Sequence, residues 1–284
     1  MTLKKKFLLL ITAVFLLVSA CVPAMAQSNV SALFINVGKA DAILLFLGDE
    51  RYLIDSGTKD AHDQLMRVLD TYDVNHLDAV FITHTDKDHA GGLKKLFKAG
   101  ITTDRIYTSA FYREVDLDDH RTYEAAEKYD IPLIWLCSGD EITAVDGSVF
   151  KVLGPLTEDP DSDNNNSLVM RLETKEGSML LTGDMELPEE AELMQAGLIA
   201  PADVLKVAHH GEDDATSLAF AIAVSPEWSV ISTSTAEEPD TPDQKVITRL
   251  MQAGSSVAVT QDAEVGILIT LLGGKVTAEQ IDWQ

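Results

Sequence analysis

HTDKDHAGG, residues 84–92, follows a short apolar run, VFI, and carries two histidines and two aspartates within six positions. Alternate residues of an extended segment point the same way, so His84 and Asp86 can face one metal ion. Asp88 and His89 can face a second ion after the chain turns. A solvated polar loop is the plain alternative, but this density of ligand-type side chains directly after a buried strand favours a metal-binding loop.

Two later strand patterns end in residues of the same kinds. One runs through LLTGD and ends at Asp184, and the other runs through LKVAHHG and ends at His209 and His210. Two metal ions held about 3.5–4 Å apart need a carboxylate that contacts both. Asp184 is the candidate for this bridge, and the three strand ends are expected to converge on one site.

Strand and helix patterns alternate through the rest of the chain. The expected strands are Ala32–Val37, Ala42–Leu47, Arg51–Ile54, Ala79–Thr83, Arg105–Thr108, Pro132–Leu136, Glu141–Val145, Val149–Leu153, Ser167–Thr174, Ser178–Thr182, Val204–Ala208, Trp228–Thr233, Ser256–Thr260 and Val265–Leu271. The expected helices are Lys59–Tyr72, Leu93–Ala99, Thr122–Tyr129, Pro188–Ala196, Ser217–Ala223 and Asp243–Ala253. Two β-rich blocks, each followed by helices, predict an α/β protein: a four-layer αββα sandwich in which two mixed sheets pack face to face beneath outer helices.

The N-terminus has the pattern of an export signal. Lys4 to Lys6 precede the mainly apolar segment Phe7–Ala20, which is shorter than the roughly 20 residues that a membrane-spanning helix needs. Two processing routes stay open: cleavage after Ala26 would release a chain that begins at Gln27, whereas VSAC would place a lipid anchor on Cys21. We expect secretion, with a lipoprotein at the cell surface as the alternative.

Removal of residues 1–26 leaves a short linker, 27–31, and a strongly acidic domain, 32–284. The remaining chain holds 19 Lys and Arg against 46 Asp and Glu, a formal charge of −27. This charge repels long polyanions, and no basic footprint typical of nucleic-acid-binding domains is present. Any anionic substrate is therefore expected to be attracted locally, by metal ions.

The remaining cysteine and three of the histidines are expected to have no role in the site. Cys137 is alone after removal of the signal, so no intrachain disulfide is possible, and its apolar neighbours predict a core position. His62, His76 and His120 lie among polar residues and are expected at the surface.

Six motifs occur in a fixed order: FINVGKADA (34–42), LIDSG (53–57), the loop at 84–92, NNNSLV (164–169), TGD (182–184) and AHHG (208–211). In these motifs the chain resembles the metallo-β-lactamase superfamily, in particular the metallo-β-lactamase domain of the DNA-uptake competence channel ComEC and its free-standing secreted relatives. The resemblance covers nearly everything from Ala32 onward.

The resemblance implies a ligand set for two divalent ions. One ion would be held by His84, Asp86 and Asp184, and the other by Asp88, His89, Asp184 and His209. His210 is the alternative ligand if the adjacent pair is reversed. The catalytic candidates are Asp88, which would orient the attacking water and accept a proton, and His210. Behind the ligands or at the substrate we expect Asp55, Asn165, Asn166, Lys206 and Thr241.

Two positions depart from the family pattern. Where the first metal position often has another histidine, this chain offers Asn165 or Asn166, so that position should bind metal more weakly. Where the family has Gly-His-Pro, this chain reads DTP around Thr241, so a histidine that contacts the oxyanion is absent.

These features together predict a metal-dependent hydrolase. Mixed histidine and carboxylate ligands favour zinc, and manganese is also compatible with so many oxygen ligands. Because the ComEC-type relatives imply nucleic-acid cleavage, the expected substrate is a small or short phosphodiester, hydrolysed by a water that both ions activate. Long nucleic acid is expected to bind weakly. The alternatives are β-lactam or lactone hydrolysis, and a non-catalytic surface protein that binds metal or ligand on the same fold.

Overall fold

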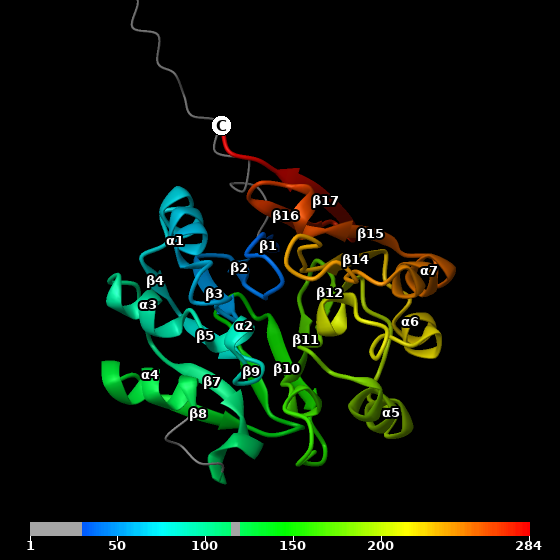
Figure 1. Ribbon diagram of the computed structural model, residues 1–284, viewed down its shortest axis with the longest axis horizontal. Helices are drawn as coiled ribbons and strands as arrows, with labels where there is room; N and C mark the ends of the chain where they lie inside the picture. Colours follow the sequence, from blue (N-terminus) through cyan, green and yellow to red (C-terminus); the bar gives the residue numbers. More distant parts are fainter. Residues whose placement is uncertain (1–29, 115–119) are drawn as a thin grey trace, which may run out of the picture.

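Two large mixed sheets pack face to face and helices cover their outer faces, as the computed structural model shows for residues 30–114 and 120–284 (Figure 1). This confirms the four-layer αββα sandwich expected from the sequence. The export signal expected at residues 1–26, with Cys21 and Gln27, lies outside the described residues. Within the described ranges, none of the helices combines the length and the apolar character needed to cross a membrane.

The first sheet has eight strands in the order β17-β16-β1-β2-β3-β5-β7-β8. Their bounds are β1 Val30–Ile35, β2 Ile43–Leu47, β3 Glu50–Ile54, β5 Ala79–Ile82, β7 Ile106–Ser109, β8 Leu133–Leu136, β16 Gly266–Leu272 and β17 Lys275–Ile281. The strands from β17 to β3 pair antiparallel, and β3, β5, β7 and β8 run parallel. The helices associated with this half are α1 His62–Thr71, α2 Lys87–Ala90, α3 Leu93–Lys98 and α4 Arg121–Tyr129.

The second sheet has seven strands in the order β15-β14-β13-β12-β11-β10-β9 and repeats this design. Their bounds are β9 Glu141–Thr143, β10 Val149–Gly154, β11 Val169–Glu173, β12 Ser178–Leu181, β13 Val204–Lys206, β14 Trp228–Ile231 and β15 Ser256–Val259. Strands β12 to β15 run parallel. The outer helices of this half are α5 Leu187–Gln195, α6 Leu218–Val224 and α7 Gln244–Gln252.

Side chains of a single strand enter two different cores. In β1, Ala32 and Phe34 belong to the core between the sheets, whereas Leu33 and Ile35 belong to the core beneath α1 and α3. Successive side chains of a strand point to opposite faces, so a strand covered on both faces must be apolar throughout. This explains the uninterrupted apolar runs that identified the strands. A third core lies under α5 to α7.

The expected helices and strands are all present, with ends shifted by up to three residues. The last strand, β17, was not predicted, since only Val276 in it is buried and its polar residues give no clear strand pattern. The short pair β4 (His76–Leu77) and β6 (Thr102–Thr103) was also missed. Strand β1 begins at Val30, two residues before the expected start of the domain.

Two expectations about single residues were wrong. His120 is buried, because its Nδ1 accepts a hydrogen bond from the Tyr123 amide at the start of α4 and its ring packs edge-on against Tyr112 and Trp135. Cys137 is exposed rather than in the core, because β8 ends at Leu136 and the chain turns outward there.

Candidate metal centre

The loops that follow five strands meet where the carboxyl edges of the two sheets adjoin. Strands β3 and β5 are parallel neighbours in the first sheet, as are β12, β13 and β14 in the second. Parallel neighbours end at the same edge, which is where ligands bind in sheets of this kind. Asp55 follows β3, His84 follows β5, Asp184 follows β12 and His210 follows β13.

Four side chains form a buried cluster at this edge: Asp41, His89, Asp184 and His210. Each offers an oxygen or nitrogen atom that lies within 4.8 Å of those of the other three, and each is at most 2% exposed. Buried groups of this kind require charge compensation or a metal ion. Asp41 was not singled out from the sequence, although it lies in the first of the six motifs.

Asp55 fixes the orientation of the His89 ring. His89 Nδ1 donates to Asp55 Oδ2 at 2.8 Å, while the Thr83 amide and hydroxyl donate to the same carboxylate at 2.8 Å each. A carboxylate that accepts from one imidazole nitrogen directs the other nitrogen to a ligand. His89 Nε2 accordingly lies 3.1 Å from Asp184 Oδ2. Asp55 thus lies behind His89 and holds its ring.

His210, and not His209, faces the cluster. Its Nδ1 donates to the carbonyl oxygen of Ser232 at 2.8 Å. Its Nε2 lies 3.2 Å from Asp184 Oδ2 and 3.5 Å from Asp88 Oδ2, without the alignment of a hydrogen bond. The expected ligand His209 lies instead with Glu186 and Asp214, and its Nδ1 donates to Asp214 Oδ1 at 2.9 Å.

Backbone conformation separates the two adjacent histidines. His209 and His210 have φ values of +46° and +54°. These values lie in the left-handed region, which residues other than glycine rarely adopt. Two such residues in succession turn the rings apart, and their centroids are 6.3 Å from each other. The following Gly211 also has a positive φ, and a Cβ there would lie 3.1 Å from Ile231 and Pro242. Strain of this kind persists only where the surrounding structure supports it.

His84 and Asp86 form a second, more open position. The His84 ring is fully buried with its centroid 4.0 Å from that of His89, and its Nε2 lies 3.8 Å from Asp86 Oδ2. The Asp86 side chain is 47% exposed. Burial, followed by the positive charge of His89, holds the pKa of His84 well below its usual range. A neutral ring with a lone pair on Nε2 is the form that binds a metal ion.

Lys206 compensates the carboxylates behind the cluster. Its fully buried ammonium contacts Asp41 Oδ2, donates to the Gly183 carbonyl at 2.8 Å and lies 3.4 Å from Asp184 Oδ1. Asp184 therefore directs one oxygen to Lys206 and the other to the two histidines. Although burial lowers the pKa of Lys206, the charges of Asp41 and Asp184 outweigh it and raise the pKa above its ordinary value.

The carboxylates of the cluster favour the protonated forms of its two histidines, His89 and His210. Although burial opposes it, Asp184 raises the pKa of His210 to about 9, and Asp184 and Asp55 raise that of His89 well above its usual range. Burial likewise disfavours the ionised forms of Asp88 and Asp184, but the neighbouring histidines hold both pKa values well below the ordinary range. Such strongly shifted groups gather at functional sites.

Three residues expected near the substrate have other partners. Asn165 Nδ2 donates to Asp159 Oδ2 at 2.9 Å, and Asn166 Nδ2 donates to the Asp159 carbonyl at 2.8 Å, so both hold the loop before β11. Thr241 is buried, with its hydroxyl 2.6 Å from that of Thr233. Asn164 instead contacts His209, with its Nδ2 3.3 Å from His209 Nε2.

The donor set fits metal binding. The buried Nε2 atoms of His84 and His210 have no hydrogen-bond partner in the described part of the chain. An unsatisfied buried polar atom costs about 1–3 kcal/mol, which coordination would offset. Imidazole nitrogens and carboxylate oxygens that converge in this way are the ligand types of zinc and other divalent ions.

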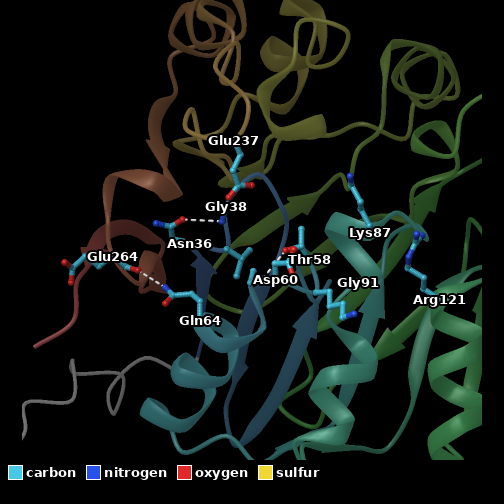
Figure 2. A pocket seen from close by; sticks show the side chains of 13 residues that line it. Asn36, Gly38, Thr58, Asp60, Gln64, Lys87, Gly91, Arg121, Glu237 and Glu264 are labelled. Carbon is cyan, nitrogen blue, oxygen red and sulfur yellow. Dashed lines mark hydrogen bonds between the residues drawn. The ribbon is translucent and has the colours of Figure 1, made fainter.

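We call residues 84–92 the metal loop. A cavity of about 820 Å³ lies beside this loop (Figure 2). Lys87 and Gly91, on either side of Asp88 and His89, line it. Other segments contribute further charged side chains, namely Lys59, Asp60, Arg121, Glu237 and Glu264. The rim of the metal cluster also carries Lys39, whose Nζ lies 2.6 Å from Glu212 Oε1.

Comparison with known proteins finds relatives of similar sequence. ComE operon protein 3 of Bacillus subtilis is 34% identical over 179 residues, which cover 63% of this chain and 23% of the relative. Competence protein ComA of Neisseria gonorrhoeae is 27% identical over 262 residues, or 91% of this chain and 35% of the relative. The chain therefore spans only a minor part of the length of these relatives.

Solved structures share the fold. The metallo-beta-lactamase fold protein YhfI from Bacillus subtilis has a TM-score of 0.57 at 14% identity and covers 85% of this chain and 99% of its own. Zn(2+)-bound PqqB from Methylobacterium extorquens has a TM-score of 0.53 at 14% identity, over 81% and 87% of the two chains. The model of the Metallo-beta-lactamase superfamily matches residues 35–234, which include all the clustered side chains, and the chain belongs to that superfamily.

Proposed function

We propose that the chain is an exported, two-metal hydrolase of phosphodiesters. The observation that carries this proposal is the position of Asp184 Oδ2, which lies 3.1 Å from His89 Nε2 and 3.2 Å from His210 Nε2. One position would use His84 and Asp86, the other Asp88, His89 and His210, and Asp184 would serve both. In this proposal His210 takes the place of His209 in the ligand set, and the position with fewer histidines would bind metal more weakly.

The chain's own residues would prepare the reaction. When bound, two divalent ions supply a nucleophilic water at neutral pH and stabilise charge on the attacking and leaving oxygens. Asp88, whose side chain is 20% exposed, can accept a hydrogen bond from the attacking water and orient it. Lys39 lies near the charges of Asp88 and Asp184, and its ammonium can face the developing oxyanion, since Thr241 is held by Thr233 and offers no cation.

Three features favour a phosphodiester over other esters. A dinuclear centre suits in-line displacement at phosphorus. The curated relatives bear the names of competence proteins, and the ComEC-type resemblance implies nucleic-acid cleavage. The cavity beside the metal loop carries Lys59, Lys87 and Arg121. Lysine and arginine are the residue types that commonly bind phosphate.

Long nucleic acid remains an unfavourable substrate because the mature chain is strongly acidic. The acidic run after the histidine pair is partly neutralised, since Glu212 pairs with Lys39 and Asp213 contacts both Lys245 and Arg249. We therefore expect the overall charge, rather than this run alone, to disfavour long strands.

The experiment is a metal analysis followed by assays on matched substrates. Protein loaded with zinc or manganese should hydrolyse bis(p-nitrophenyl) phosphate, and Asp184→Asn should abolish this turnover. A chromogenic β-lactam and a lactone serve as the comparison substrates. Turnover of either one without phosphodiester turnover would support that alternative, and bound metal without any turnover would support a binding protein.

Export is proposed from residues 1–26 alone. Mass spectrometry of the mature protein should find either Gln27 at the N-terminus or a lipid on Cys21. Intact Met1 on protein from the cell interior would contradict export.

A further inference from the structure

The cavity beside the metal loop is connected to the metal cluster by three segments of chain. Gly38 lines the cavity and Asp41, three residues later, belongs to the cluster. Lys87 and Gly91 line it on either side of Asp88 and His89. Arg121 lines it from α4, and its Nη1 donates to the Thr85 carbonyl within the metal loop at 2.8 Å. A ligand in the cavity would therefore contact the same loop that carries Asp88 and His89.

Three cations line this cavity, Lys59, Lys87 and Arg121. Among residues 30–114 and 120–284, no carboxylate lies within ion-pair distance of Lys59, Lys87 or Arg121. Other lysines of this acidic chain do have such partners, as Lys94 has in Glu124 and Lys151 has in Glu173. A cation without a carboxylate partner loses no ion pair when an anion binds.

Backbone amides already engage two of the carboxylates that line the cavity. Glu237 Oε2 accepts from the Lys39 amide at 3.0 Å, and Glu264 Oε2 accepts from the Trp283 amide at 3.2 Å. Lys87 and Arg121 lie at one end of the cavity and Glu264 lies at the opposite end, with Asp60 between them (Figure 2). The basic end is the one formed by the metal loop.

We propose that Lys87 and Arg121, with Lys59, form a subsite for a second phosphate of the substrate, next to the phosphodiester that is cleaved. This inference deepens the proposed function and rests on it for the identity of the substrate. Its ligand class is a nucleotide with a flanking phosphate, such as the end of a short oligonucleotide. Arginine suits a phosphate because its planar group donates two parallel hydrogen bonds, and lysine adds a point charge.

The subsite explains how so acidic a protein can select a dianionic substrate. Surface carboxylates about 10 Å away act across a full Debye length at physiological salt, whereas the cavity cations would contact the phosphate directly. A ligand with two phosphates fits inside this local region. A long strand does not, because each further phosphate must lie against the acidic surface.

The test compares two ligands that differ by one phosphate, thymidine 3′,5′-bisphosphate and thymidine 5′-monophosphate. Calorimetry on the metal-loaded protein gives the ratio of their Kd values without any need for turnover. We expect the wild-type protein to prefer the bisphosphate, and Lys87→Ala and Arg121→Ala each to reduce this preference by about fivefold, the upper range for an exposed ion pair. Arg121→Lys should restore part of it.

Lys98→Ala is the matched control, because Lys98 is an exposed cation on α3 that does not line the cavity. It should retain the wild-type ratio. An equal Kd for both nucleotides in the wild-type protein, or an unchanged preference in Lys87→Ala and Arg121→Ala, would overturn the subsite. A preference for the bisphosphate together with no hydrolysis of any phosphodiester would leave the subsite standing and refute the proposed function.

Discussion

The imidazole rings of His209 and His210 belong to adjacent residues, yet they face different networks. His210 Nε2 lies 3.2 Å from Asp184 Oδ2, whereas His209 Nδ1 donates to Asp214 Oδ1 at 2.9 Å. Loss of a residue that hydrogen-bonds a metal ligand typically weakens metal binding by about 10–100-fold. We expect His210→Ala to exceed this range, and His209→Ala to fall below it, because His209 is hydrogen-bonded to Asp214 rather than to a clustered side chain. Competition with a chromogenic chelator measures both affinities. Equal losses would show that both rings contact metal.

Asp184 is expected to affect both metal positions, whereas His84 should affect one. Asp184→Asn removes the carboxylate that lies between His89 and His210, so elemental analysis should find almost no bound ion. His84→Ala should retain close to one ion per chain, held by the other position. Loss of both ions from His84→Ala as well would contradict this assignment.

Lys206 should contribute strongly to stability because it is buried among carboxylates. Lys206→Met leaves Asp41 without its compensating charge, and loss of one partner of a buried pair costs about 3–5 kcal/mol. Urea unfolding in the presence of a chelator measures the free energy without the metal contribution. The exposed Lys175 is the control, since Lys175→Met should change stability by less than about 0.5 kcal/mol. Adding Asp41→Asn to Lys206→Met should restore part of the loss.

Glu189 makes stability depend on pH. Both its carboxylate oxygens are buried and lack a hydrogen-bond partner in the described part of the chain. Burial, then the charges of Glu192 and Glu186, raise the pKa of Glu189 well above its usual range. A raised folded-state pKa stabilises the protein below the unfolded-state value of about 4.3, and this contribution is lost as the pH rises through the folded-state value.

Glu189→Gln should therefore unfold at higher urea concentration than the wild-type protein at pH 8 and at a similar concentration at pH 4. Glu158 and Glu189 line one cavity of about 190 Å³, and Glu158→Gln at this exposed position should show no such pH-dependent difference. A destabilised Glu189→Gln protein at pH 8 would mean that the ionised carboxylate has a stabilising partner.

Salt should favour long substrates relative to short ones. Screening weakens repulsion between the acidic surface and a long strand, while direct contacts of one or two phosphates persist at short range. Turnover of a dinucleotide-sized ester and of long single-stranded DNA should be compared at low and high salt. Tight binding of the long strand that weakens with salt, as in a basic nuclease, is the opposite result.

Local patterns accounted for most of the secondary structure, because strands covered on both faces must be apolar throughout and outer helices must be amphipathic. Phe34 and Phe81 lie in such runs, and both are fully buried between the sheets. The sequence does not predict strand β17, because this strand lies at the edge of its sheet and is held by pairing with β16 rather than by burial. His120 was misread because its capping bond depends on where α4 begins.

The chemical identity of the metal loop was determined by the sequence itself. His84, Asp86, Asp88 and His89 follow a buried strand within six positions, and that spacing places them on one loop whatever surrounds it. Lys206 and Asp184 likewise stand at the ends of recognisable strands.

Only the tertiary structure decided which side chains meet. Asp41 enters the cluster from a turn with no pattern of its own, because β1 and β2 place that turn at the carboxyl edge of the sheet. Whether His210 or His209 faces the cluster depends on two successive left-handed residues, a conformation that residues other than glycine rarely adopt. Local patterns report which groups a segment offers, whereas the direction of each group depends on backbone torsions that distant packing imposes.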